Sequence, residues 1–145
     1  MKTIKLSDIQ ISDDFRKTPP HDRKIKKAIR YIKKFKRIDK PIVLNDGVLV
    51  DGYSRYLASI TTGMKEVPYV ELQEINYIVG KFDNSNKEYT WKNDSCIDIK
   101  VGDKVLVESR SVSKNKVKRL YVNVVDIFLS DSLEEYNKHR RVIGK

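Results

Sequence analysis

The stretch most capable of chemistry runs from residue 48 to residue 58, where an apolar run ends in Asp51 and Gly52. A helix-forming segment follows at once, which predicts the order strand, tight turn, helix start. Gly52 allows the backbone to turn at low steric cost. Ser54 is placed to cap the helix, whose first amides lack an internal partner. One spot is therefore expected to hold three attractive groups for an anion: the free amides, the positive end of the helix dipole and Arg55. Among anions, a phosphate fits this arrangement best.

This pattern also has a simpler interpretation. Many αβ proteins pass from strand to helix through Asp-Gly with nothing bound there, and surface arginines are usually only solvated. The local pattern therefore leaves two interpretations open, a phosphate site and an ordinary turn.

Composition limits the class of protein. A chain of 145 residues allows one domain or two small ones. It has no apolar run of about 18 residues, and its N-terminus lacks the apolar core of a signal peptide. The single cysteine, Cys96, excludes an internal disulfide and a multi-cysteine zinc site, and the two histidines lie far apart in the sequence. We expect a cytoplasmic protein with no membrane partner and no metal site.

The net charge of +10 is concentrated in one segment. Residues 16–40 hold 12 Lys and Arg against two acids, Asp22 and Asp39, whereas the remainder of the chain is balanced. Apolar residues in this segment recur at steps of three and four and predict an amphipathic helix from about residue 21 to residue 37. The expected apolar stripe is Ile25, Ala28, Ile29, Ile32 and Phe35.

Basic residues fill the other faces of this predicted helix. We expect the nucleic-acid-binding residues to be Lys24, Lys26, Lys27, Arg30, Lys33, Lys34 and Arg37. Few acids are present to pair them, so their mutual repulsion is unrelieved, and a polyanion such as DNA would relieve it. The alternative is a solvated charged face, because charge alone indicates affinity for polyanions and not sequence specificity.

The remaining pattern predicts an α+β fold in two domains, residues 1–72 and 73–145. In the first half, strands are expected at 3–6, 9–11, 41–44, 48–50 and 67–72, a loop at 13–20 and a second helix at 54–62. Asn45-Asp46-Gly47 is a strong hairpin signal. In the second half, strands are expected at 77–82, 88–91, 104–108 and 118–128, followed by a helix that Ser132 caps.

Several short strands separated by turns predict that residues 73–145 form a small SH3-like β-barrel with a C-terminal helix. Its aromatic residues Tyr89, Trp91 and Tyr121 could form a base-stacking surface, but in so small a barrel we favour a role in the core. A basic hairpin tip, which serves either phosphate contact or solubility, is expected from Lys114, Lys116, Lys118 and Arg119.

Residues 1–72 resemble the N-terminal domain of the ParB/sulfiredoxin superfamily. The resemblance lies in the Pro-Ile-Val strand, the short turn and the segment Leu-Val-Asp-Gly-Tyr-Ser-Arg-Tyr-Leu-Ala. In ParB proteins this segment is a Gly-Glu-Arg-Arg-x-Arg-Ala box that binds the triphosphate of a cytidine nucleotide, and in sulfiredoxin a Gly-Cys-His-Arg segment binds ATP phosphates. Matching the motif places the family glycine on Gly52, the arginine on Arg55 and the alanine on Ala58.

The resemblance implies a phosphate or nucleotide site formed by Arg16, Gly52, Tyr53, Ser54 and Arg55. Arg16 is included in this expected site because residues 15–20 are similar to the ParB segment around Asn-Pro-Arg. The implied ligand is CTP or ATP, with Mg²⁺ only in the company of the nucleotide.

The departures from the family pattern bear on catalysis. Tyr53 and Ser54 stand where ParB has Glu-Arg, and Leu57 stands where it has a later arginine, so CTP hydrolysis does not carry over. Tyr53 also occupies the position of the sulfiredoxin cysteine, and that chemistry requires a thiolate. The chain is therefore not expected to be a sulfiredoxin. Members of this superfamily are often labelled "ParB-like nuclease", and Asp51 is the one candidate catalytic residue beside the expected phosphate spot.

Three functions remain open at this point. The first is a ParB-like nucleic-acid-associated protein, of the kind found as a bacterial, plasmid or phage accessory protein. The second is a ParB-like nuclease that acts on DNA. The third is a non-catalytic interaction protein that has lost the nucleotide site. Exposed barrel edges are compatible with a homodimer, but no residue pattern demands one.

Overall fold

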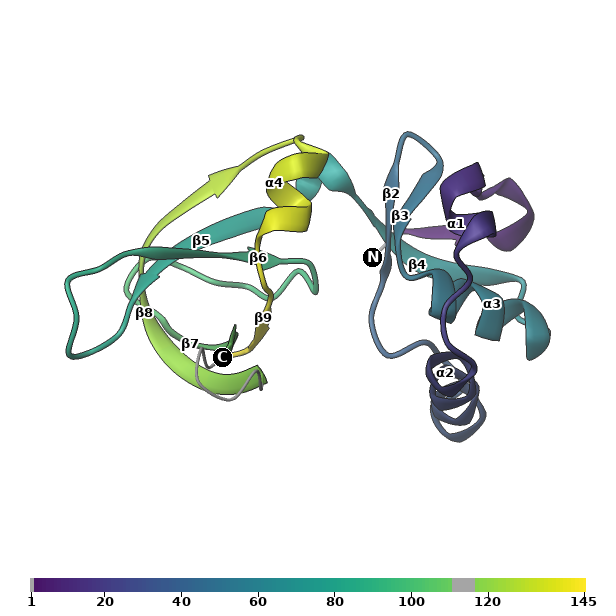
Figure 1. Cartoon of the computed structure of the whole chain (residues 1–145), viewed down its shortest axis with the longest axis horizontal. Coiled ribbons are helices and arrows are strands. Elements are labelled where there is room, and N and C mark those ends of the chain that lie inside the picture. The colour runs from purple at the N-terminus through teal and green to yellow at the C-terminus, as the bar shows by residue number, and fades with distance from the viewer. Residues whose placement is uncertain (1, 111–116) are drawn as a thin grey trace. The chain divides into compact units, whose positions relative to one another are not determined.

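The chain forms a mixed α+β structure with two sheets (Figure 1). The computed structural model describes residues 2–110 and 117–145, so the expected turn at 111–116, with Lys114 and Lys116, lies outside the described residues. The structure divides into two compact units, Met1–Glu71 and Leu72–Lys145. Each unit has its own hydrophobic core cluster.

The first unit is built on a four-stranded sheet in the order β1-β4-β2-β3. Its strands are β1 (Thr3–Lys5), β2 (Ile42–Asn45), β3 (Val48–Asp51) and β4 (Glu66–Glu71). Strands β2 and β3 form the predicted hairpin, in which Asp46 and Gly47 both have positive φ, 52° and 83°, as a type I′ turn requires. Strand β4 runs parallel to β2, so the chain must cross over after β3. Helix α3 (Tyr53–Thr61) makes this crossover.

Helix α2 (Asp22–Phe35) packs against α3, and a hydrophobic core lies between these helices and the sheet. Ile32 of α2, Ala58 of α3 and Leu44 of β2 belong to the same buried cluster. Phe35 is an exception to the predicted apolar stripe, because its side chain is 46% exposed. It lies at the edge of the stripe and packs on the ring of Tyr31, with ring centroids 4.5 Å apart.

The loop expected at residues 13–20 is partly wrong, because Asp13–Lys17 forms a short helix, α1. The Ser12 hydroxyl caps it by accepting a hydrogen bond from the Phe15 amide at 3.3 Å. Acidic residues in the first turn and basic residues in the last turn complement the helix dipole. The strand expected at 9–11 is reduced to a single bridge between Gln10 and Val48, after a 3-10 turn (η1, Leu6–Asp8).

The second unit is a curled five-stranded antiparallel sheet in the order β6-β5-β8-β7-β9 (Figure 1). After a 3-10 turn (η2, Leu72–Glu74) come β5 (Asn76–Lys81), β6 (Tyr89–Asn93), β7 (Lys104–Arg110), β8 (Val117–Leu129), α4 (Leu133–Lys138) and β9 (Val142–Gly144). An isolated bridge between Lys92 and Arg141 joins the other edge, β6, to the segment that leads into β9. A short helix, α4, forms where the C-terminal helix was expected, but strand β9 follows it, so the second unit ends in a strand and not in a helix.

The aromatic residues of this unit divide between core and surface. Trp91 is buried in the core cluster, and its indole N–H donates to the Glu108 carbonyl at 2.9 Å. Tyr89 and Tyr121 are exposed, so the expectation that all three belong to the core is wrong for these two. Tyr89 is exposed because it is the first residue of β6, which is an edge strand.

Replacing Tyr77 by phenylalanine should stabilise the second unit by about 1 kcal/mol at neutral pH, because the tyrosine hydroxyl is buried without a hydrogen-bond partner among the described residues. Burial, then the charges of Glu135 and Asp94, raise the pKa of Tyr77 to about 12. The folded state thus holds this proton more tightly than the unfolded state, whose tyrosine titrates near 10, so stability should fall as pH rises from about 10 to 12.

The measurement for Tyr77→Phe is urea unfolding followed by the fluorescence of Trp91, the single tryptophan, which lies in the core cluster of the second unit. Between about pH 10 and 12, the free energy of unfolding of the variant should fall less than that of the wild type, because the contribution of Tyr77 is gone. Tyr121→Phe, which changes an exposed tyrosine, is the matched control and should resemble the wild type. A less stable Tyr77→Phe protein would show that the hydroxyl contributes a favourable interaction.

Candidate functional site

The turn into α3 leaves the first helical amides uncapped. Gly52 is the N-cap, with φ 103° and ψ 27°, and no side chain among the described residues makes a capping hydrogen bond. The expectation that Ser54 caps the helix is wrong, because the left-handed turn at Gly52 starts the helix at Tyr53 and makes Ser54 its second residue. No acidic residue lies in the first turn to offset the positive end of the dipole. We call Gly52, Tyr53, Ser54 and Arg55 the helix-start site.

The Arg55 guanidinium lies directly over Gly52. A Cβ atom placed on Gly52 would lie 2.7 Å from Nη2 and 3.0 Å from Nε of Arg55, and 2.8 Å from Cγ2 of Ile42. The Arg55 side chain is only 11% exposed. The absence of a side chain at Gly52 therefore allows a cation to approach the backbone at the start of α3.

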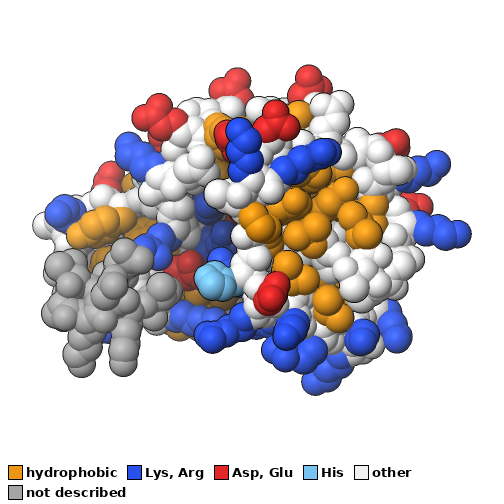
Figure 2. Space-filling model, turned by 45° about the vertical axis from the view of Figure 1, so that its right-hand side comes forward, with side chains coloured by type: hydrophobic (Ala, Val, Ile, Leu, Met, Phe, Trp, Pro, Cys, Tyr) orange, Lys and Arg blue, Asp and Glu red, His pale blue; other side chains and the backbone are white. Residues whose placement is uncertain are grey.

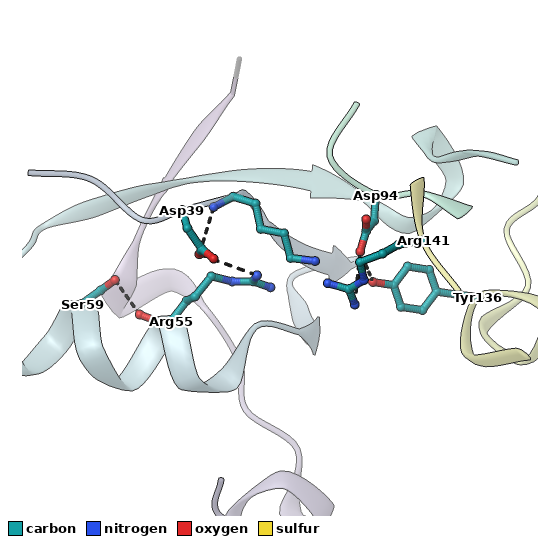
Figure 3. A network of polar contacts seen from close by, with 7 residues as sticks. Asp39, Arg55, Ser59, Asp94, Tyr136 and Arg141 are labelled. Carbon is teal, nitrogen blue, oxygen red and sulfur yellow. Dashed lines mark hydrogen bonds and ion pairs between the residues drawn. The ribbon is translucent and has the colours of Figure 1, made fainter. Parts of the chain in front are cut away.

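The hydrogen-bonding capacity of this guanidinium is largely unused. Nε of Arg55 is buried and has no hydrogen-bond partner among the described residues. Nη1 lies 4.0 Å from Oδ1 of Asp39, which is an ion-pair distance but too long for a hydrogen bond (Figure 3). The carbonyl of Arg55 accepts a hydrogen bond from Ser59 at 2.7 Å, which fixes the helix and not the cation. A poorly paired and nearly buried guanidinium attracts an anion.

Asp39 is the residue of this site that sequence reasoning missed. It lies between α2 and β2, far from Arg55 in sequence, and no spacing pattern connects the two. Its neighbour Ile38 is buried, which anchors this segment, and Asp39 Oδ1 accepts a hydrogen bond from the Lys40 amide at 3.0 Å. Asp39 is more than half exposed, so it is a weak counterion that an incoming phosphate could displace.

Tyr53 is held by ring packing. Its ring lies between Phe15 of α1, at a centroid distance of 5.4 Å, and Tyr56 of α3, at 6.2 Å. The packing places α1 beside the start of α3, and Arg16 is the next residue along α1, with an exposed side chain. The Tyr53 ring thus belongs to the edge of the core, and its amide is the part left for a ligand.

Asp51 is the last residue of β3 and is half-buried, in register with Val43 of β2. In the part of the chain that the structure describes, no group of three or more His, Cys, Asp and Glu side chains could hold a metal ion. Cys96 lies in the second unit. No contact within residues 2–110 and 117–145 favours the nuclease alternative over the other two.

Helix α2 carries a basic face opposite its buried stripe. Six of the seven predicted nucleic-acid-binding residues lie on α2, whereas Arg37 follows its left-handed C-cap, Lys36. The basic side chains of α2 are all exposed: Arg23, Lys24, Lys26, Lys27, Arg30, Lys33 and Lys34. Among the described residues none of them forms an ion pair. Figure 2 shows lysine and arginine side chains gathered along the lower right edge, where α2 lies.

No protein-family model and no curated protein match this sequence. Among solved structures, the chain is similar to a Pnob8-like ParB-N domain, with 21% sequence identity and a TM-score of 0.43. The match covers 48% of this chain and 28% of that one, so the chain spans well under a third of that protein's length. None of the helices in the described ranges has both the length and the apolar character needed to cross a bilayer.

Proposed function

We propose that this protein is a ParB-like nucleic-acid-associated protein that contacts the phosphate backbone of DNA through α2. The observation that carries the proposal is the set of seven exposed and unpaired cationic side chains on one 14-residue helix. Asp22 is the one acid on that helix. Repulsion among these charges is relieved when they neutralise phosphates and release counterions. The resemblance of residues 48–58 to the ParB box supports the same class of function.

The test is the salt dependence of binding to a fluorescently labelled duplex of about 20 base pairs. If α2 neutralises about four to six phosphates, the logarithm of the binding constant should fall against the logarithm of salt with a slope of about −4 to −5. Binding that does not respond to salt, or no binding at low salt, would contradict the proposal.

A second part of the proposal concerns the helix-start site. We infer that it binds the phosphates of a nucleotide, with CTP and ATP as the ligands to test and Mg²⁺ entering only with the nucleotide. The supporting observation is the nearly buried Arg55 guanidinium, whose Nε lacks a partner among the described residues and whose counterion, Asp39, is distant and exposed. Arg16, on the helix that packs beside Tyr53, is the proposed second phosphate contact.

Replacing Arg55 by alanine should weaken nucleotide binding by about 10- to 100-fold, the loss expected for charge-assisted hydrogen bonds to a phosphate. Thermal stability should change little, because the arginine is poorly paired in the free protein. Isothermal titration with CTP and ATP measures the first quantity and a thermal melt the second. Lys65→Ala, at an exposed position of the same unit, is the control and should bind like the wild type. Failure of the wild type to bind either nucleotide at millimolar concentration would remove this part of the proposal.

For the second unit we keep the SH3-like barrel as a proposal about architecture. The curled sheet and the Lys92–Arg141 bridge support it.

A further inference from the structure

The second unit contains an open polar cavity of about 310 Å³ with a basic lining. Its walls come from β6, from β7, from the end of α4 and from the segment that joins α4 to β9. The charged and titratable residues of the lining are Lys92, Lys138, Arg140, Arg141, His139 and Glu108. Four cations and one carboxylate line the cavity, and Asp94 offsets the charge of one of these cations, Arg141, at 3.5 Å. An excess of positive charge remains, so the cavity has a positive potential.

Backbone hydrogen bonds hold the basic segment in place. The Lys92 amide donates to the Arg140 carbonyl at 2.8 Å, and the Glu108 amide donates to the Arg141 carbonyl at 3.1 Å. These bonds clamp residues 140 and 141 between β6 and β7. The fold thus brings Lys92 of β6 together with residues almost 50 positions later, and backbone hydrogen bonds fix this arrangement.

Lys92 is the residue whose environment most clearly indicates that a ligand binds in this cavity. It is only 7% exposed, yet none of the described carboxylates lies within ion-pair distance of it. Its ammonium donates to the Tyr136 carbonyl at 3.2 Å and lies 3.7 Å from the centroid of the Tyr136 ring. These contacts orient the cation but leave its charge uncompensated. Removing a charge from water without an opposite charge is unfavourable.

The neighbouring acids pair with two other residues of the lining and not with Lys92. Oε1 of Glu135 lies 2.6 Å from Nε2 of His139. Oδ2 of Asp94 lies 3.5 Å from Nη2 of Arg141, as Figure 3 shows. Glu108 opposes an anion in the cavity, but Lys92, Lys138 and Arg140 outnumber it even after Asp94 offsets Arg141. An anion with several acceptor oxygens is the ligand whose chemistry matches this arrangement.

We propose that this cavity binds a phosphoryl group, with Lys92 as the charge at its base and Arg140 and Arg141 as the guanidinium donors at its wall. Tetrahedral phosphate oxygens accept hydrogen bonds from an ammonium and from guanidinium groups at once. The site is separate from the helix-start site and lies in the other unit. The phosphoryl group belongs either to a small phosphorylated compound or to the backbone of a nucleic acid.

The experiment uses the full chain labelled with ¹⁵N and follows the amides of residues 92 and 137–141 by NMR. Pyrophosphate and a mononucleotide form one arm, a short single-stranded oligonucleotide forms the other, and sodium chloride at equal ionic strength is the salt control. We expect saturable shifts at these amides that chloride does not reproduce. Stronger binding of the oligonucleotide identifies the nucleic-acid source, and saturation by pyrophosphate or mononucleotide alone identifies the small-molecule source.

Lys92→Met should weaken this binding at least about tenfold, because it removes one charge-assisted contact. Without ligand, its melting temperature should equal or exceed that of the wild type, since methionine fills similar space without a buried charge. A lysine with only a structural role would instead give a less stable protein with unchanged binding, and that result overturns the proposal. So does the absence of shifts at these amides with every phosphate ligand.

Two further variants keep the proposal testable. Arg140→Gln removes one of the cations in the wall of the cavity and should also weaken phosphate binding. It replaces Lys92→Met as the test if that variant does not fold. Lys100→Gln removes an exposed charge of the same unit outside the cavity and should leave binding unchanged. Arg55→Ala should leave the shifts at residues 137–141 intact, which separates failure of this site from failure of the helix-start site.

Discussion

Charge reversal at four positions of α2 should abolish DNA binding at about 0.1 M salt, with a loss of at least about 100-fold. The variant replaces Lys26, Lys27, Arg30 and Lys33 by glutamate. These residues follow one another at steps of one, three and three on the solvent side of the helix, whereas Ile32 faces the core. Four attractions to phosphate become four repulsions, so the effect should exceed that of removing the charges.

The graded form of this experiment replaces the same four residues by glutamine. If all four contact phosphates, the slope of binding against salt should become less negative by about 3 to 4. Circular dichroism should show an unchanged helix content, because glutamine is a good helix former and the buried stripe is intact.

The matched control reverses four exposed lysines outside α2: Lys5, Lys65, Lys87 and Lys100. It changes the net charge by the same amount and leaves the basic face of α2 in place. This variant should keep most of the affinity, since the contacts of α2 with phosphates persist. An equal loss in both variants would show that net charge, and not α2, determines binding.

Local patterns predicted the elements whose formation depends on local physics. The hairpin turn at Asp46-Gly47 is confirmed, because Asp and Gly tolerate the two adjacent positive φ angles that a type I′ turn requires. The amphipathic helix is confirmed over Asp22–Phe35, since its apolar stripe needs only a hydrophobic surface to cover it. Helix α1 was missed even though Ser12 and two following acids are an N-terminal helix signal, because the two prolines downstream favoured a loop.

The location of the candidate site could be predicted from the sequence, but the contacts between its residues could not. Gly52 and Arg55 were identified from the turn and from the family motif, and the structure brings their atoms together. Asp39 could not be found, because only the tertiary packing of the α2–β2 connection places it near Arg55. The cavity at Lys92 was missed for the same reason, since its charges come from distant segments that hydrogen bonds between strands join.

Replacing Gly52 by alanine should destabilise the first unit by about 2 to 4 kcal/mol and displace the Arg55 guanidinium. Two effects add. A φ of 103° is strained for any residue with a Cβ atom and costs about 1 to 2 kcal/mol. The new methyl group would also lie 2.8 Å from Cγ2 of the fully buried Ile42, which cannot move away without disturbing the core. Nucleotide binding at the helix-start site should be lost together with the arginine position.

Native-state hydrogen exchange of the amides in β2 and β3 measures this destabilisation, and the amides of β5 in the second unit serve as an internal reference. Gly47→Ala is the control variant, because Gly47 also has a positive φ but has open space around its Cα. It should lose only about 1 kcal/mol, the strain of the backbone alone. The difference between the two variants then measures the crowding at Gly52.

A double-mutant cycle isolates the contact between Gly52 and Arg55. In an Arg55→Ala background, Gly52→Ala should be less destabilising, since the guanidinium that would lie 2.7 Å from the new methyl group is gone. The strain in φ and the overlap with Ile42 remain in both backgrounds, so the coupling energy reports the approach of the guanidinium to Gly52. Additive effects would mean that the guanidinium does not lie over Gly52 in solution, and the helix-start site would then lack its principal cation.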